Sequence, residues 1–345
     1  ASATYLAGGM YAPEGIKLSE GNYFDMTSSI RNPSFEFNGL ENWTNNGMQS
    51  QTNNSPEDIG WSKDGRVYVE KWVDKEKNLP DANISQVLTG LPVGKYKVVA
   101  LGHVVKQSSN EIAEGGALYA GIYDASVNIP GEYVVETIVT DGTLEIGFRM
   151  VNTTGNWAAV DHFRLQYYGE DMQAYFRHLQ EKVKQARAVL ESPNHPNCFN
   201  VEQLNRVIQN AGQVNTEDKE ALFDAVRSID EALKESADII SDYARLKTAI
   251  DEFSVLLDKA SDYPQAGKER LLGVLGTVTQ FYESKESQRD KIDEQIELLT
   301  INGYILIRYS ILDKDVVQAE KLYSETDYDS KEIFGNAIRL AKDVL

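Results

Sequence analysis

Two hydrophobic periods divide the chain. From Asp25 to Tyr168, apolar residues come in short β-branched and aromatic runs that Gly, Pro, Asn and Asp interrupt, which is typical of strands and turns. After Gly169 the apolar residues recur at spacings of three and four, which is typical of amphipathic helices. The sequence therefore predicts a multidomain chain, first all-β and then all-α, with its junction at Tyr168–Glu170.

The all-β region divides into short strands at turn residues. Leu91–Gly94 predicts a turn that leads into a strand, and Thr140–Thr143 contains Asp-Gly, which favours a β-hairpin between its two neighbouring runs. The predicted strands are Met26–Phe35, Arg66–Trp72, Asn83–Leu88, Gly94–Val104, Ala117–Ala125, Tyr133–Thr140, Thr143–Val151 and Trp157–Tyr167. Short strands at this spacing, with no helical stretch among them, favour a β-sandwich.

The helical region consists of repeats. One apolar helix face begins at Met172 and stops before Ser192–Pro196, and the next helix follows Asn200 as its N-cap. The same order begins again at Tyr243 and once more at Ala319. The sequence thus predicts tandem three-helix bundles of roughly 65–70 residues each, the last one incomplete.

These patterns set the predicted domain boundaries. Neither Pro nor Gly occurs from Asn215 to Tyr263, so we expect the last helix of one repeat to continue into the first helix of the next. The predicted domains are an irregular leader (1–24), a β-sandwich (25–168), two three-helix repeats (169–238 and 239–312) and the start of a third (313–345). The unfinished third repeat indicates that the chain is part of a longer polypeptide.

The charge and the composition limit the classes of partner that the chain can bind. A formal net charge of -19 argues against nucleic acid and acidic polymers, and it leaves a neutral ligand or a cation. No run of about 18 apolar residues occurs, so no membrane span is expected. The single cysteine, Cys198, excludes a disulfide within the chain and is expected to be an ordinary loop residue. The first residues read as a mature N-terminus from which a signal peptide has been removed.

Three segments resemble a known family. They are Asp25–Glu36 followed by Asn42–Thr44, then Ile84–Tyr96, and finally Gly155–Leu165. Together they are similar to the galactose-binding-like β-sandwich (jelly roll) modules attached to polysaccharide-degrading proteins of gut Bacteroidetes. The helical part, best at Tyr243–Ile250, is similar to three-helix repeats of the FIVAR type, often described as possible sugar-binding units.

The resemblance implies a function and a metal. It implies non-catalytic binding of a neutral glycan or polysaccharide, outside the cell or at the bacterial cell surface or periplasm, with the helical repeats as a stalk or accessory binding units. In similar sandwiches a structural calcium ion lies where the first segment meets the last strand. The matching carboxylates here are Glu36 and Asp161, and Ca²⁺ prefers such oxygen ligands.

Aromatic side chains are the candidate sugar contacts. An indole or phenol ring stacks on the C–H face of a sugar, while polar side chains bond to the hydroxyl groups. Tyr68, Glu70 and Trp72 alternate on one face of a predicted strand. The predicted carbohydrate-binding residues are Trp61, Trp157, Trp72, Tyr68, Arg149 and Asn156. For each tryptophan the alternative is packing in the core, which Trp43 resembles most.

No catalytic motif stands out. The four histidines form no metal-binding pair, nucleophile and phosphate-loop motifs are missing, and acidic residues are too common on the helices to single out a glycosidase pair. The chain is therefore predicted not to be an enzyme. Two alternatives stay open: a surface adhesion or structural protein that binds a protein partner, and a glycoside hydrolase with an unrecognised site. Most helical aromatics are expected to be core residues.

Overall fold

The computed structural model describes residues 3–6, 10–13, 18, 21–58, 60–61, 63–107, 111–192, 200–259, 263–284, 289–325 and 331–345. The chain forms two compact units. One comprises Ala1–Gln180 with Asn215–Asp224, and the other comprises Glu181–Val214 with Ala225–Leu345. Cys198 lies outside the described residues.

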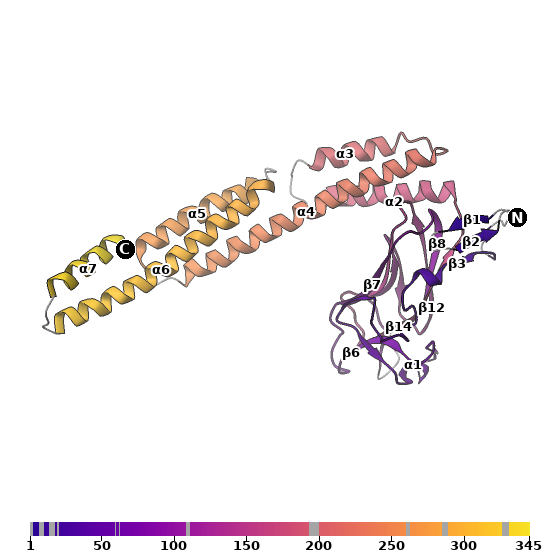
Figure 1. Cartoon of the computed structure of the whole chain (residues 1–345), viewed down its shortest axis with the longest axis horizontal. Coiled ribbons are helices and arrows are strands. Elements are labelled where there is room, and N and C mark those ends of the chain that lie inside the picture. The colour runs from indigo at the N-terminus through magenta and orange to yellow at the C-terminus, as the bar shows by residue number, and fades with distance from the viewer. Residues whose placement is uncertain are drawn as a thin grey trace. The chain divides into compact units, whose positions relative to one another are not determined.

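An antiparallel β-sandwich of two sheets forms most of the first unit (Figure 1). The seven-stranded sheet has the order β12-β8-β14-β6-β5, with β3 paired to β14 and β9 to β8. Its strands are β3 (Phe24–Asp25), β5 (Gln49–Gln51), β6 (Tyr68–Trp72), β8 (Gly94–Lys106), β9 (Glu111–Ile112), β12 (Gly131–Val139) and β14 (Trp157–Tyr167). The five-stranded sheet, in the order β11-β10-β13-β7-β4, contains β4 (Thr44–Asn46), β7 (Ala82–Leu88), β10 (Gly116–Ala120), β11 (Tyr123–Val127) and β13 (Leu144–Met150). The predicted β-sandwich is confirmed.

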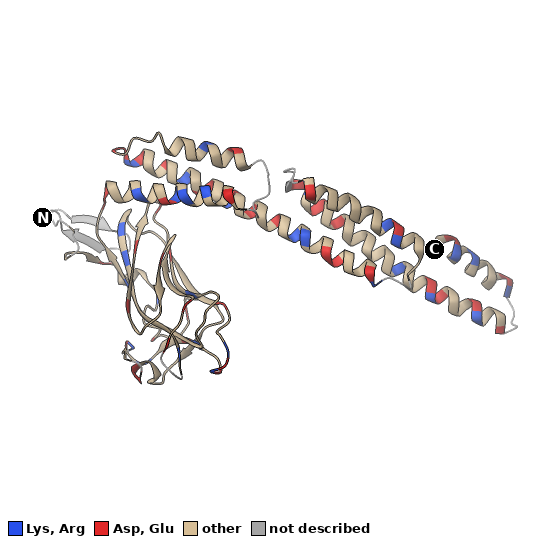
Figure 2. Cartoon of the chain, turned by 180° about the vertical axis from the view of Figure 1, so that it is seen from behind, with Lys and Arg blue, Asp and Glu red and all other residues tan. Residues whose placement is uncertain are grey.

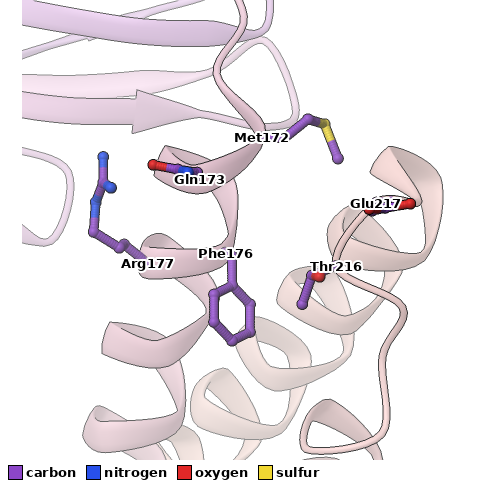
Figure 3. A pocket seen from close by; sticks show the side chains of 6 residues that line it. All are labelled: Met172, Gln173, Phe176, Arg177, Thr216 and Glu217. Atoms are coloured by element: carbon purple, nitrogen blue, oxygen red, sulfur yellow. The ribbon is translucent and has the colours of Figure 1, made fainter.

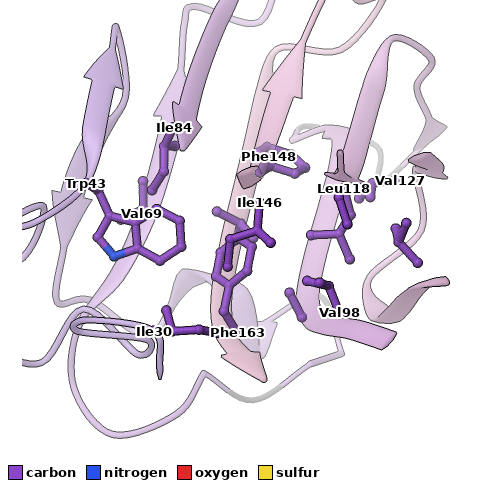
Figure 4. Close-up of a cluster of buried hydrophobic side chains, with 14 of the residues drawn as sticks. Ile30, Trp43, Val69, Ile84, Val98, Leu118, Val127, Ile146, Phe148 and Phe163 are labelled. Atoms are coloured by element: carbon purple, nitrogen blue, oxygen red, sulfur yellow. The ribbon is translucent and has the colours of Figure 1, made fainter. Parts of the chain in front are cut away.

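The sandwich core lies between the two sheets (Figure 4). Side chains of both sheets point inward, so Val98 of β8 and Phe163 of β14 meet Ile146 and Phe148 of β13; a bulge between Asp161 and Arg164 shifts the alternation along β14. Trp43 also belongs to this core, where its ring packs 4.7 Å from that of Phe163. Burial of this apolar surface is the main force that holds the sheets together.

The predicted Asp-Gly hairpin at Thr140–Thr143 is wrong. β12 pairs with β8 in one sheet, whereas β13 pairs with β7 and β10 in the other, so this turn carries the chain from sheet to sheet. The dipeptide still makes a tight turn: Gly142 has a φ of 82°, and the Leu91 N–H donates to its carbonyl at 3.0 Å. Val139 and Leu144, on either side of the turn, both face the one core.

Two other predicted strands also differ. Met26–Phe35 is a short 3₁₀ helix (η1, Thr27–Ser29) followed by turns, because the Asn32 side chain bonds to the backbone of Phe37 and Gly39 and favours a loop. Ala117–Ala125 is the hairpin of β10 and β11.

Short elements appear where the sequence predicted none. Where an irregular leader was predicted, β1 (Ala3–Leu6) and β2 (Met10–Pro13) form a two-stranded antiparallel sheet. A one-turn helix, α1 (Ser55–Asp58), lies between β5 and β6.

Long helices follow the sandwich in the chain. They are α2 (Met172–Glu191), α3 (Asn200–Ala211), α4 (Lys219–Asp258), α5 (Gln265–Ser284), a 3₁₀ turn η2 (Arg289–Lys291), α6 (Ile292–Glu325) and α7 (Lys331–Val344). The expected continuous helix is confirmed, since α4 has 40 residues without a break. The predicted boundaries at 238/239 and 312/313 fall inside α4 and α6.

The helices of the second unit share a core. Leu246 and Ile250 of α4, Leu271 of α5 and Leu299 and Leu306 of α6 are buried together, as the apolar spacing predicts. Acidic and basic side chains both occur along the helices (Figure 2). Within the described part of the chain, no helix has the length and apolar character needed to cross a membrane.

Candidate functional site

The outer face of the seven-stranded sheet brings two predicted tryptophans together. Along β6, Val69 points into the core, while Tyr68, Glu70 and Trp72 point to the opposite face. Trp72 is directly opposite Trp157 of β14 in the antiparallel register, and opposed residues share a face. Two strands that are far apart in the sequence thus place two indoles side by side.

Trp157 is anchored by a buried carboxylate. The Trp157 Nε1–H donates to Glu70 Oε2 at 2.9 Å, and the Tyr68 hydroxyl, which lies 3.2 Å from the same oxygen, has a shorter hydrogen bond of 2.5 Å to Asn53 Oδ1. Gln51 and Gln49 donate side-chain N–H groups to the other oxygen, Oε1, at 3.3 and 3.4 Å. Glu70 is only 3% exposed, and these neutral donors take the place of water around its charge.

Trp61 covers part of this face. It lies between β5 and β6, it is 5% exposed, and its Nε1–H donates to His103 Nδ1 at 2.5 Å. The His103 ring in turn packs 4.3 Å from the ring of Trp157. Because Trp61 can only donate, His103 Nδ1 must accept, so the ring proton lies on Nε2. Burial lowers the pKa of His103 to about 3, and the ring is therefore neutral at pH 7.

The expectation that Trp61 and Trp157 are open for stacking is wrong. Both indoles are buried: Trp61 packs with Tyr68 and Ala159 in a cluster separate from the sandwich core, and Trp157 packs against His103. The physical reason is the segment between β5 and β6, which folds onto the outer face and removes it from water. Alternation along a strand identifies the face to which a side chain points, but it does not reveal what covers that face.

Trp72 is the exposed member of the group. Half of its surface (50%) is open to solvent. On the same face, Glu70 and Gln49 occupy the next positions of β6 and β5, and Gln51, opposite Tyr68, lies further along. A flat, exposed ring on the same face as two amides provides a stacking surface with hydrogen-bonding groups near it. The alternation of Gln49 and Gln51, in register with Glu70 and Tyr68, is the signal that could have identified the two glutamines from the sequence.

Arg149 and Asn156 do not join this face. Arg149 lies on β13 of the other sheet, pairs with Asp124, and lies 5.0 Å from the centre of the Tyr119 ring. Asn156 is 2% exposed, and its Oδ1 accepts the backbone N–H of Gln107 at 2.7 Å. Asn156 therefore fixes a backbone turn, and Arg149 belongs to a different surface.

The predicted calcium ligands both hold the turn before β6. Glu36 Oε1 accepts backbone N–H groups of Arg66 and Val67, each at 2.6 Å, and Asp161 Oδ2 accepts that of Asp64 at 2.7 Å. These bonds join the first segment of the sandwich to its last strand through the backbone of one shared turn.

The environment of Asp161 suits a cation in part. Burial raises the pKa of Asp161 to about 8, and the nearby carboxylates of Asp64 and Glu36 act in the same direction. Three mutually repelling carboxylates with hard oxygen atoms fit Ca²⁺ in ligand type. However, the described residues contain no group of three His, Cys, Asp or Glu side chains arranged to hold a metal ion. An ion here would need backbone carbonyls or water to complete its ligands.

Cavities in the described residues lie away from these side chains. One of about 560 Å³ is lined by Met172, Gln173, Phe176, Arg177, Thr216 and Glu217 (Figure 3). Another, of about 480 Å³, contains two carboxylates, those of Glu320 and Glu332. Both carboxylates are exposed, and Glu320 pairs with Lys342 at 2.7 Å. A glycosidase pair needs its acid and its nucleophile in two different environments, whereas these two carboxylates are both open to water.

Comparisons with known proteins give partial similarities. No protein-family model and no curated protein matches the chain. TmCBM61, solved with β-1,4-galactotriose, has 22% identity and a TM-score of 0.31 over 40% of this chain and 96% of its own. A family 35 carbohydrate-binding module from Clostridium thermocellum has 13% identity and a TM-score of 0.26 (36% and 92% covered). The K1 cleaved adhesin domain of Lys-gingipain from Porphyromonas gingivalis W83 has 16% identity and a TM-score of 0.30 (39% and 96%).

Proposed function

We propose that the β-sandwich is a non-catalytic module that binds a neutral glycan on the outer face of its seven-stranded sheet. The observation that supports this most directly is the half-exposed indole of Trp72 on the same face as the amides of Gln49 and Gln51. The ring stacks on the apolar face of a sugar, and the amides of Gln49 and Gln51 bond to its hydroxyl groups.

The buried residues of the face serve to position the exposed ones. Glu70 is held by Trp157 and accepts the side-chain N–H groups of Gln49 and Gln51, so it fixes these two amides on the face. Preorganisation of this kind lowers the entropy lost when a ligand binds. The net charge of -19 would repel an acidic polysaccharide, which makes a neutral one the better partner.

The same proposal implies how the module gains affinity and where it acts. A single shallow site of this size binds weakly, and affinity then comes from several sites within a longer polypeptide. We place the protein outside the cell or at a bacterial surface, with the helical unit as a stalk or accessory unit.

A calcium ion at Glu36 and Asp161 is a second part of the proposal. It would neutralise carboxylates that now raise the pKa of Asp161, and it would strengthen the junction between the first segment and β14. Thermal unfolding, followed by tryptophan fluorescence with Ca²⁺ and with a chelator, tests this: we expect a higher midpoint with Ca²⁺, which Asp161→Asn abolishes. Equal midpoints in the wild type would contradict a stabilising ion.

Glycan binding is tested with a panel of neutral oligosaccharides and polysaccharides. We expect Trp72→Ala to weaken any binding by about tenfold or more, since stacking of a ligand on an aromatic side chain contributes roughly 1–3 kcal/mol. Phe37→Ala is the matched control, because Phe37 is also an exposed aromatic residue (63%) of the sandwich region and lies outside the face. Equal loss in both variants would contradict a site at Trp72. No binding to any glycan by the wild type would favour a protein partner instead.

A further inference from the structure

Helix α6 has a second apolar face, which is open to solvent. Ile301, Tyr304 and Ile311 are 47%, 55% and 49% exposed, although α6 already buries Leu299 and Leu306 in the core of its bundle. An ordinary surface helix buries one apolar stripe and keeps charged residues opposite to it. An additional stripe of large apolar residues indicates an interaction surface.

Two charged residues, Glu297 and Arg308, lie on the same line of the helix as this stripe. Glu297, Ile301, Tyr304, Arg308 and Ile311 follow each other at steps of four, three, four and three, so they lie on one line along the helix, and all five are exposed. The Arg308 Nε–H donates to the Tyr304 hydroxyl at 2.7 Å, and the guanidinium lies 4.9 Å from the centre of the Tyr304 ring. The order along the line is thus acid, apolar, aromatic, base, apolar.

We infer that α6 pairs in antiparallel orientation with α6 of a second copy of this chain. A two-fold axis between positions 302 and 303 places Ile301 against Tyr304 of the second copy. The same axis places Glu297 against Arg308 of the second copy, twice by symmetry, so the order of charges complements itself. Steps of four and three are the spacing of a coiled-coil seam, in which apolar residues of two helices interlock.

The charges also decide the orientation. A parallel pair would place Glu297 against Glu297 and Arg308 against Arg308, and like charges that face each other across a helix interface are destabilising. Leu298 and Ile307, which are 43% and 41% exposed, flank the seam and extend the apolar contact. The partner that fits this face is therefore the chain itself.

The oligomeric state of the full chain tests the apolar part. Analytical ultracentrifugation over a concentration series should show a reversible dimer for the wild type, and Ile301→Glu should weaken the association by about tenfold or more. Leu272→Glu on α5 is the matched control, since Leu272 is 63% exposed and lies off the seam; it should leave the dimer unchanged. A wild type that remains monomeric, or a dimer that Ile301→Glu does not weaken, overturns the inference.

A charge exchange tests the register. Glu297→Arg and Arg308→Glu, each alone, place like charges together and should dissociate the dimer. An equal mixture of these two variants restores two opposite pairs per dimer, so it should form a heterodimer. Circular dichroism checks that each variant keeps its helices, which is expected because both positions face solvent. If the mixture stays monomeric while Ile301→Glu has dissociated the wild type, the antiparallel register is wrong.

Discussion

Trp72 and Trp157 are directly opposed on the antiparallel strands β6 and β14, yet one indole is half-exposed and the other is buried. Their different burial follows from what lies on top of each ring. His103 and Trp61 close over the Trp157 end of the face, and Trp72 extends beyond them. Trp157 therefore belongs to the buried, structural part of the face, and Trp72 belongs to the part that a ligand reaches.

The two tryptophans should differ in their effect on stability. Trp157→Ala creates a cavity and removes a donor from Glu70, so we expect it to lower the free energy of unfolding of the sandwich by about 3–5 kcal/mol. Trp72→Ala removes an exposed ring and should cost about 1 kcal/mol or less. Urea unfolding followed by tryptophan fluorescence measures both, because all four tryptophans lie within residues 43–157. Similar losses of unfolding free energy in the two variants would contradict a structural role for Trp157 and an exposed position for Trp72.

Glu70 should tolerate an amide better than an apolar side chain. In Glu70→Gln one oxygen still accepts from Trp157, while Gln49 and Gln51 can rotate their amides to accept from the new N–H group. We expect a loss of about 1 kcal/mol. Glu70→Leu leaves the Trp157 donor buried without an acceptor and removes the acceptor of Gln49 and Gln51, so the loss should reach about 3 kcal/mol. The comparison fails if the two variants unfold at the same urea concentration.

The contribution of His103 to the stability of the sandwich should fall as the pH falls from 7 to 5, whereas Asp161, whose folded-state pKa is raised, contributes in the opposite direction. Burial lowers the folded-state pKa of His103 to about 3, whereas the unfolded histidine has its ordinary value. Below the ordinary pKa the unfolded chain binds a proton that the folded chain does not bind. The stability that His103 contributes is thus present above pH 6.5 and is lost below it, by about 2 kcal/mol at pH 5.

His103→Gln isolates this contribution. Glutamine offers Trp61 an acceptor oxygen but does not titrate in this range. The difference in unfolding free energy between the wild type and His103→Gln should therefore shrink as the pH drops from 7 to 5. A difference that stays constant over this interval would show that His103 is not kept neutral by burial.

Two glycines in the helical unit should respond oppositely to alanine. A Cβ at Gly303 of α6 would lie 2.2 Å from the ring of Phe253 on α4, so Gly303→Ala forces the two helices apart and should destabilise by about 1–3 kcal/mol. A Cβ at Gly276 of α5 meets nothing within 4 Å, and Gly276→Ala should stabilise by about 0.5–1 kcal/mol. Thermal unfolding followed by helix circular dichroism gives the two signs, and a gain for Gly303→Ala would contradict the close approach.

Helices and strands were predicted best where the apolar residues of a segment have one clear pattern. The strand Trp157–Tyr167 and the helix beginning at Met172 agree with the structure at nearly every residue, because burial on one face imposes their period. The Asp-Gly signal at Thr140–Thr143 failed for a different reason: local turn chemistry fixes the bend but not the sheet to which each arm belongs. That choice depends on β8 and β7, which are distant in the sequence.

The candidate site was predictable only in part. Alternation correctly placed Tyr68 and Trp72 on one face, and the register supplied Trp157. The roles of Trp61 and His103 depend on a tertiary contact between a loop and a strand. No local pattern contains that information, so exposure of an individual tryptophan could not be inferred.

The position of β14 has a consequence for how the protein is made. This last strand of the sandwich lies inside its sheet, between β8 and β6, and the Leu165 N–H donates to Thr27 Oγ1 across 138 residues of sequence. Because the tight turn at Asp141–Gly142 joins strands of different sheets, it cannot start a local hairpin that the rest extends. Closure of the sandwich must wait until Tyr167 has left the ribosome, and folding through such distant pairings is expected to be slow.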